Sequence, residues 1–146
     1  MKRSKLLLLT PLLLAGCIQQ SASYYIESNQ HALSLRAEQE YFWKDDVVVK
    51  MAAARLPECQ RLFPIATLPI ADFNVELFSG GDNVYSLRSG KQTWRFETQT
   101  CTQLTEPTEA ELGTPLGVFR LDAQKKLVFA KAASAPAAAP AEVPAS

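Results

Sequence analysis

Hydrophobic and polar residues alternate with a period of two through the middle of the chain. The alternation runs through residues 73–77, 85–88 and 93–97, and this period is typical of strands that bury one face. Glycine-rich and polar turn segments separate the runs at residues 79–83 and 89–92. The pattern therefore predicts three consecutive antiparallel strands joined by tight turns.

A second hairpin is predicted near the C-terminal side. Apolar residues gather at 118–121 and 127–129, and a polar segment at 122–125 separates them. The preceding segment, residues 102–117, holds Pro107, Pro115 and two glycines. We expect that segment to be a loop.

The N-terminal half is less regular. Residues 33–41 keep a two-residue spacing with one exception, which favours a strand, but their good helix formers leave a helix open over 32–43. The strand is favoured because a turn-like segment at 44–46 leads to the β-branched run at 47–49. Residues 56–69 contain three prolines, and we expect an irregular crossover there.

These segments together predict an all-β fold. A small antiparallel β-sandwich, or a barrel-like meander, of about six to eight strands accommodates them. A domain of this size has a modest core, so any covalent cross-link matters to its stability.

The first residues have a different pattern. Lys2, Arg3 and Lys5 precede an apolar run over residues 6–14, and small residues then lead to Cys17. The run is about half of the roughly 20 residues that cross a bilayer, so it predicts an export signal rather than a membrane span. The sequence Leu-Ala-Gly-Cys that ends at Cys17 resembles the lipobox of bacterial lipoproteins.

This resemblance implies that Cys17 is acylated and becomes the first residue after cleavage. Ile18 follows it, where an Asp would favour retention in the inner membrane, so sorting to the periplasmic face of the outer membrane is implied. Two or three acyl chains hold a protein firmly on a membrane. The expected divisions are a signal peptide (1–16), an acylated tether (17–23), a β domain (24–131) and a disordered Ala/Pro-rich tail (132–146).

The charge balance argues against a nucleic-acid partner. The whole chain has 15 basic and 15 acidic residues, and loss of the signal removes three basic ones. The mature chain then has 12 basic against 15 acidic residues. Binding through phosphates needs clustered Lys and Arg, and the only adjacent basic pair of the mature chain is Lys125-Lys126 at a predicted hairpin tip.

The cysteine count changes once Cys17 is assigned to lipid, because Cys59 and Cys101 remain as a pair. In an oxidising compartment they predict a disulfide. A redox couple or a pair of metal ligands is the alternative, but there is no C-x-x-C spacing and His31 is the only histidine.

Catalytic patterns are weak. No Gly-rich phosphate loop or nucleophile elbow occurs, and Gly80-Gly81 lies in a predicted turn, so we expect no enzyme activity, no cofactor and no metal site. Glu38 with Glu40, or Asp45 with Asp46, could form the two carboxylates of a glycan hydrolase. Alternating charges on a strand are more often its solvated face.

Aromatic residues supply the candidate binding surface. Tyr41, Phe42 and Trp43 are consecutive, so a strand there would place side chains on both of its faces. An exposed Phe42 would suit a protein interface, a glycan platform or membrane headgroups. Burial under a loop or in a thin sandwich is the alternative.

The region from Tyr24 to Phe129 resembles a family of small uncharacterised lipoproteins of Gram-negative bacteria. The resemblance lies in residues 36–43, 57–61, 81–85 and 116–121. It implies lipoprotein character and brings no activity or binding residues. Small disulfide-bonded β-barrel lipoproteins that inhibit lysozyme are similar in size and layout, although their signature loop motifs do not occur here.

The leading hypothesis is a non-enzymatic outer-membrane lipoprotein that binds an envelope protein or peptidoglycan. A lysozyme-inhibitor-like binder is the alternative, and a carboxylate-based cell-wall hydrolase comes third.

Overall fold

The structure of the protein, a computed structural model, describes residues 18–133. The predicted signal peptide, the lipidation site Cys17 and most of the Ala/Pro-rich segment lie outside the described residues. Within the described range the chain forms ten strands and one short 3-10 helix, η1 (Glu109–Glu111). The strands are β1 (Gln19–Ser28), β2 (His31–Glu38), β3 (Asp46–Arg55), β4 (Cys59–Pro69), β5 (Asn74–Gly81), β6 (Val84–Ser89), β7 (Gln92–Glu97), β8 (Thr102–Leu104), β9 (Thr114–Leu121) and β10 (Leu127–Lys131).

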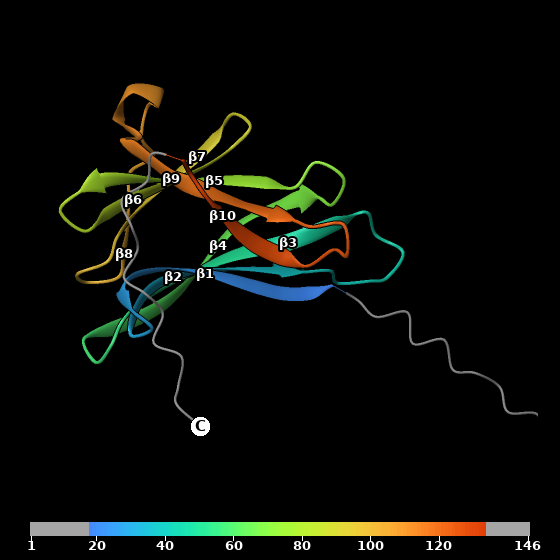
Figure 1. Cartoon of the computed structure of the whole chain (residues 1–146), viewed down its shortest axis with the longest axis horizontal. Coiled ribbons are helices and arrows are strands. Elements are labelled where there is room, and N and C mark those ends of the chain that lie inside the picture. Colours follow the sequence, from blue (N-terminus) through green and yellow to red (C-terminus); the bar gives the residue numbers. More distant parts are fainter. Residues whose placement is uncertain (1–17, 134–146) are drawn as a thin grey trace, which may run out of the picture.

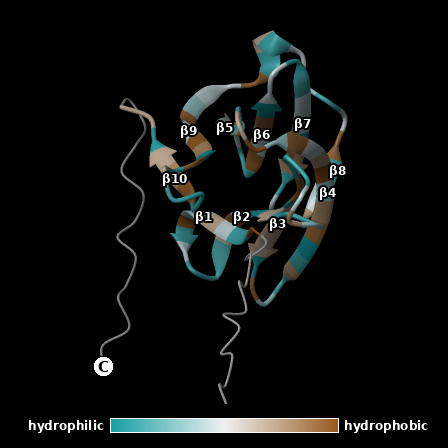
Figure 2. Ribbon diagram, turned by 90° about the vertical axis from the view of Figure 1, so that its right-hand side faces the viewer, coloured by the Kyte–Doolittle hydropathy of each residue, from teal (hydrophilic) through white to brown (hydrophobic). Residues whose placement is uncertain are grey.

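The strands form two antiparallel sheets. β1 to β4 make a four-stranded sheet in chain order, and the six-stranded sheet has the order β10-β9-β5-β6-β7-β8. β1 lies against β10, and a view along the long axis shows the strands arranged around a shared interior (Figure 2). The chain crosses from the first sheet to the second at residues 70–73.

The core lies between the sheets and follows the predicted alternation. Inward-facing positions of both sheets are buried, while their neighbours point outward. The side chains with the least exposure come from both sheets: Leu33, Leu35, Val47, Val49, Met51, Val75, Leu77, Leu87, Phe96 and Phe119. This burial of apolar area is the main stabilising contribution to the fold.

The predicted all-β architecture with one disulfide is confirmed. The hairpin of β9 and β10, the meander of β5 to β7 and the pairing of β2 with β3 all occur. The β5–β6 turn is a tight connection in which Asp82 and Asn83 both have positive φ, of 47° and 64°, as primed hairpin turns require. Because β2 spans His31–Glu38, residues 32–38 form a strand and not a helix.

Three segments differ from the sequence prediction, and they account for ten strands instead of about six to eight. The expected tether over residues 17–23 is wrong, because β1 begins at Gln19 and Ile18 is already buried. The expected irregular crossover over 56–69 is instead mostly β4, an edge strand. Edge strands tolerate proline because one side of the strand has no ladder partner, and Pro64 lies at a register shift.

The third difference concerns residues 102–117, which were expected to be a loop. The short strand β8 occupies the start of this segment, and β9 begins at Thr114, four residues earlier than the apolar run at 118 indicates. Gly117 pairs within the β9–β10 ladder. Its missing side chain leaves room for the carbonyl of Ala130 and the ring of Phe129.

Most of the connections gather at two opposite ends of the domain (Figure 1). The N-terminal end holds Ile18 and the loops at residues 39–45, 70–73 and 122–126. The disulfide end holds the turns at residues 29–30, 56–58, 82–83 and 98–101.

Candidate functional site

The predicted aromatic surface lies at the N-terminal end. Tyr41, Phe42 and Trp43 are not in a strand, because β2 ends at Glu38, and they occupy the loop that leads to β3. Their exposed fractions are 48%, 61% and 65%. Burial of Phe42, the alternative considered above, is therefore wrong, and these side chains form an exposed cluster that we call the aromatic loop.

The aromatic side chains pack on one another. The rings of Tyr41 and Trp43 are stacked with their centroids 4.8 Å apart, and Phe42 meets Trp43 edge to face at 5.0 Å. Both arrangements are favourable aromatic geometries. The ammonium group of Lys44 lies 5.5 Å from the centre of the Tyr41 ring.

Polar contacts fix the shape of the loop. The backbone N–H of Lys44 donates to the carbonyl of Tyr41 at 3.1 Å, and the side-chain amide of Gln39 donates to the carbonyl of Lys44. Lys44 also pairs with Glu40 at 3.1 Å, and this hydrogen bond raises the pKa of Lys44. The loop is thus closed by the contacts of Lys44 with residues 39–41.

The same Gln39 ties the loop to the start of the domain. Its backbone N–H donates to the carbonyl of Ile18 at 2.7 Å, and its side-chain oxygen accepts from the N–H of Ile18 at 3.3 Å. Ile18 directly follows Cys17. The sequence contained a signal for a strand that begins near Ile18. Ala22, Tyr24 and Ile26 continue the two-residue spacing from Ile18, and the serines at 21 and 23 occupy the alternate positions.

The disulfide end is covalently closed. Cys59 at the start of β4 is bonded to Cys101 in the β7–β8 turn, 42 residues later. The predicted disulfide is therefore present, and it joins the first sheet to the second. Cys101 is fully buried.

Hydrogen bonds link four turns around this disulfide. His31 Nε2 lies 3.1 Å from Thr98 Oγ1, and the backbone N–H of Thr98 donates to the carbonyl of Asn83 at 2.9 Å. Arg55 Nη1 donates to Asn83 Oδ1 at 3.3 Å. The sequence pattern does not predict this network, in which His31 is buried.

Glu97 holds the turn that leads to Cys101. Its carboxylate accepts hydrogen bonds from the backbone N–H groups of Gln99 and Thr100 and, at 2.6 Å, from the hydroxyl of Thr100. Partial burial raises the pKa of Glu97, but the hydrogen bonds from Thr100 and Gln99 outweigh it and leave the pKa lowered.

Burial raises the pKa of Tyr85, in the core, to about 12.

Of the carboxylates considered for hydrolysis, Glu38 and Glu40 each form an ion pair with a lysine. Glu38 lies 3.0 Å from Lys50, and Glu40 lies 3.1 Å from Lys44. Glu38 ends β2 and Glu40 lies in the loop after it, so the two carboxylates do not share one face of a strand. Each carboxylate accepts from its own lysine, which is the arrangement of a solvated surface pair.

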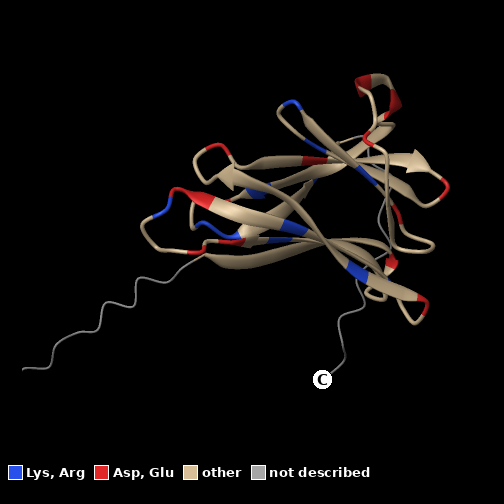
Figure 3. Ribbon diagram, turned by 180° about the vertical axis from the view of Figure 1, so that it is seen from behind, with Lys and Arg blue, Asp and Glu red and all other residues tan. Residues whose placement is uncertain are grey.

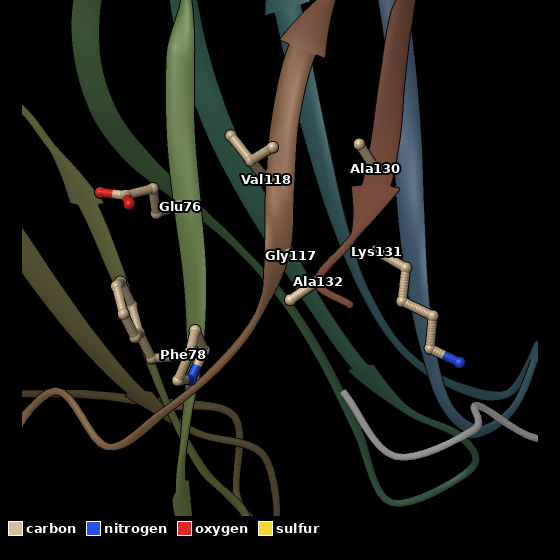
Figure 4. A pocket seen from close by; sticks show the side chains of 8 residues that line it. Glu76, Phe78, Gly117, Val118, Ala130, Lys131 and Ala132 are labelled. Carbon is tan, nitrogen blue, oxygen red and sulfur yellow. The ribbon is translucent and has the colours of Figure 1, made fainter. Parts of the chain in front are cut away.

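A shallow groove lies on the outer face of the six-stranded sheet (Figure 4). Phe78, Val118 and Ala130 form its apolar part, with Glu76 on one side and Lys131 on the other (Figure 4). Its volume is about 250 Å³, below the roughly 300–1,000 Å³ of typical small-molecule sites. Glu76 already accepts a hydrogen bond from Arg88 at 2.7 Å, so the groove has few polar groups left to orient a ligand.

Among residues 18–133, no three His, Cys, Asp or Glu side chains gather as metal ligands. Over the same range the structure contains no helix of the length and apolar character needed to cross a membrane.

Comparison of the chain with protein-family models, with curated proteins and with solved structures found no match. The resemblance to small Gram-negative lipoproteins therefore stays a prediction from the sequence, and the function has to be argued from this structure.

Proposed function

We propose that the protein is an outer-membrane lipoprotein whose β domain is a non-enzymatic binding module on the periplasmic face. The acyl chains on Cys17 hold the N-terminal end at the membrane. The disulfide end then points away from the bilayer and meets an envelope partner.

The observation that carries this proposal is the absence of a spacer between Ile18 and the folded domain. Ile18 is 8% exposed and hydrogen-bonded to Gln39, and β1 begins at the next residue. An anchor on Cys17 would therefore restrict the orientation of the whole domain, since one peptide unit spans only about 3.8 Å. A domain held in this way presents the same end to the periplasm at all times.

The construction of the disulfide end supports a binding role. Its turns are braced by the Cys59–Cys101 bond and by the contacts of Asn83 with Arg55 and Thr98, so little conformational entropy is lost when a partner binds. Leu56 is 44% exposed on the β3–β4 turn. An exposed apolar side chain on a braced turn gives a protein partner apolar surface to bury.

The test is a pull-down with tagged, acylated mature protein from solubilised envelopes. Leu56→Asp should release the partner, whereas Leu62→Asp, which alters a side chain 48% exposed in the middle of β4, should not. Co-sedimentation with purified peptidoglycan measures wall binding separately. Recovery of lysozyme alone would favour the inhibitor alternative.

Two further results would contradict the proposal. If Cys17→Ser leaves membrane fractionation and acylation unchanged, Cys17 is not the anchor. If the protein hydrolyses peptidoglycan and Glu38→Gln or Glu40→Gln abolishes that activity, the domain is a hydrolase and not a non-enzymatic binding module.

A further inference from the structure

We propose that the aromatic loop is a second membrane contact. Tyr41, Phe42 and Trp43 insert into the headgroup region of the leaflet that holds the acyl chains of Cys17. This inference rests on the proposed function, because it requires the acyl anchor.

The position of the loop is the first argument. Gln39 is hydrogen-bonded to Ile18 through both its backbone and its side chain, and Ile18 is the neighbour of Cys17. Cys17 is covalently joined to Ile18, so an acyl anchor on it would hold Ile18, and with it the paired Gln39 that begins the loop, close to the leaflet. The loop and the start of β1 lie at the same end of the domain (Figure 1).

The chemistry of the side chains is the second argument. Trp and Tyr concentrate at membrane–water interfaces because their rings are apolar and carry one polar group. Phe42 and Trp43 have the largest exposed fractions of any large hydrophobic side chain among the described residues, 61% and 65%. Contact with lipid would remove this apolar surface from water.

The rigidity of the loop is the third argument. The ring stack of Tyr41 and Trp43 and the hydrogen bond from Gln39 to the carbonyl of Lys44 hold the cluster in one shape before it meets a surface. Insertion therefore costs little ordering entropy. The flexible stem of Lys44 lets its ammonium group stay in the headgroup region while the rings go deeper.

Charge distribution separates this mode of binding from an electrostatic one. The three loops of the N-terminal end and the adjoining Asp46 carry five acidic and three basic side chains, and both signs are visible on these loops (Figure 3). Anionic headgroups would repel such a surface slightly rather than attract it. The contact must therefore come from burial of the aromatic rings, and it should respond weakly to salt.

Space at the anchor favours lipid over a protein as the occupant. With the acyl chains inserted a few residues away, a partner protein would have to fit between the aromatic loop and the bilayer. The leaflet itself is the one surface that the anchor brings to the loop at high effective concentration.

The experiment uses the tryptophan fluorescence of acylated mature protein in phosphatidylcholine vesicles. The chain has two tryptophans, exposed Trp43 and core Trp94, of which Trp94 is 7% exposed. Lipid brominated on its acyl chains quenches only an indole that reaches the membrane. Trp43→Phe gives the background from Trp94, and Trp43→Phe with Leu56→Trp moves the exposed indole to the disulfide end as a matched control.

We expect wild-type emission to fall in brominated vesicles, at low and at high salt, with no fall in either variant. Unchanged wild-type emission from acylated protein that co-sediments with the vesicles would overturn the membrane contact and leave the anchor intact. Mass spectrometry that finds no acyl chains would overturn the proposed function and this inference together. A loss that disappears at high salt would also contradict insertion of the rings.

Discussion

Removal of the Cys59–Cys101 disulfide tests how the two sheets are held together. The perturbation is Cys59→Ala with Cys101→Ala in a mature chain that also carries Cys17→Ser, so that no other thiol remains. β4 is joined to the second sheet at both of its ends. The chain connects it to β5 at residues 70–73, and the disulfide connects its first residue to the β7–β8 turn.

The magnitude follows from the loop that the bond closes. A separation of 42 residues corresponds to a chain-entropy contribution of about 4 kcal/mol. Domains of this size have a total stability of roughly 5–15 kcal/mol, so the variant should still fold but with a much smaller margin. With a urea dependence of about 1.5 kcal/mol per molar, the unfolding midpoint should fall by roughly 2–3 M.

The assay is urea unfolding followed by the fluorescence of Trp94, which is buried in the core. Reduction of the parent chain without any substitution is the control, because it breaks the bond and leaves the side-chain volumes unchanged. An additional loss in the alanine variant would measure the packing of Cys101, which is fully buried. A midpoint that moves by less than about 0.5 M in both experiments would refute the reasoning.

Three other substitutions test the packing and the turns. Gly117→Ala should cost about 1–3 kcal/mol in urea unfolding, because the new methyl group would collide with the carbonyl of Ala130 and the ring of Phe129. Phe119→Ala should cost about 3–5 kcal/mol by the same assay, since its ring is fully buried and packs at 4.8 Å from that of Phe129. Glu97 has a lowered pKa in the folded state, so its contribution is present above the unfolded value of about 4.3 and is lost as the pH falls through the folded value. Glu97→Gln should therefore lower stability by about 1 kcal/mol at neutral pH and flatten the acid limb of the stability curve, and an unchanged limb would contradict this.

The hairpins were predictable because local chemistry determines them. Asp82 and Asn83 tolerate positive φ, and the flanking alternation sets which face is buried. The strand β1 was missed because Gln20 interrupts its period-two apolar positions and Ala22 is small. The sequence singled out Tyr41, Phe42 and Trp43 but placed them in a strand, because the alternation of β2 was extended past Glu38. In the structure they lie in the loop that follows β2.

The network at the disulfide end could not be predicted in the same way. His31 and Thr98 are 67 residues apart, and Arg55 and Asn83 are 28 apart. Neither pair has a spacing that a strand or turn would impose. Such contacts depend on how the sheets stack, which the pattern of a single strand does not contain.

The position of β4 explains why the disulfide is needed at that edge. Of its 11 residues only Phe63 and Leu68 are buried, so β4 contributes little to the core and depends on its ladder with β3. Proline removes a hydrogen-bond donor from that strand, and an edge strand has no second neighbour to compensate. A covalent bond at Cys59 and the chain connection beyond Pro69 hold β4 where core contacts are few. The same bond also fixes the turns of the disulfide end, so the stability of this edge and the rigidity of the proposed binding surface have one cause.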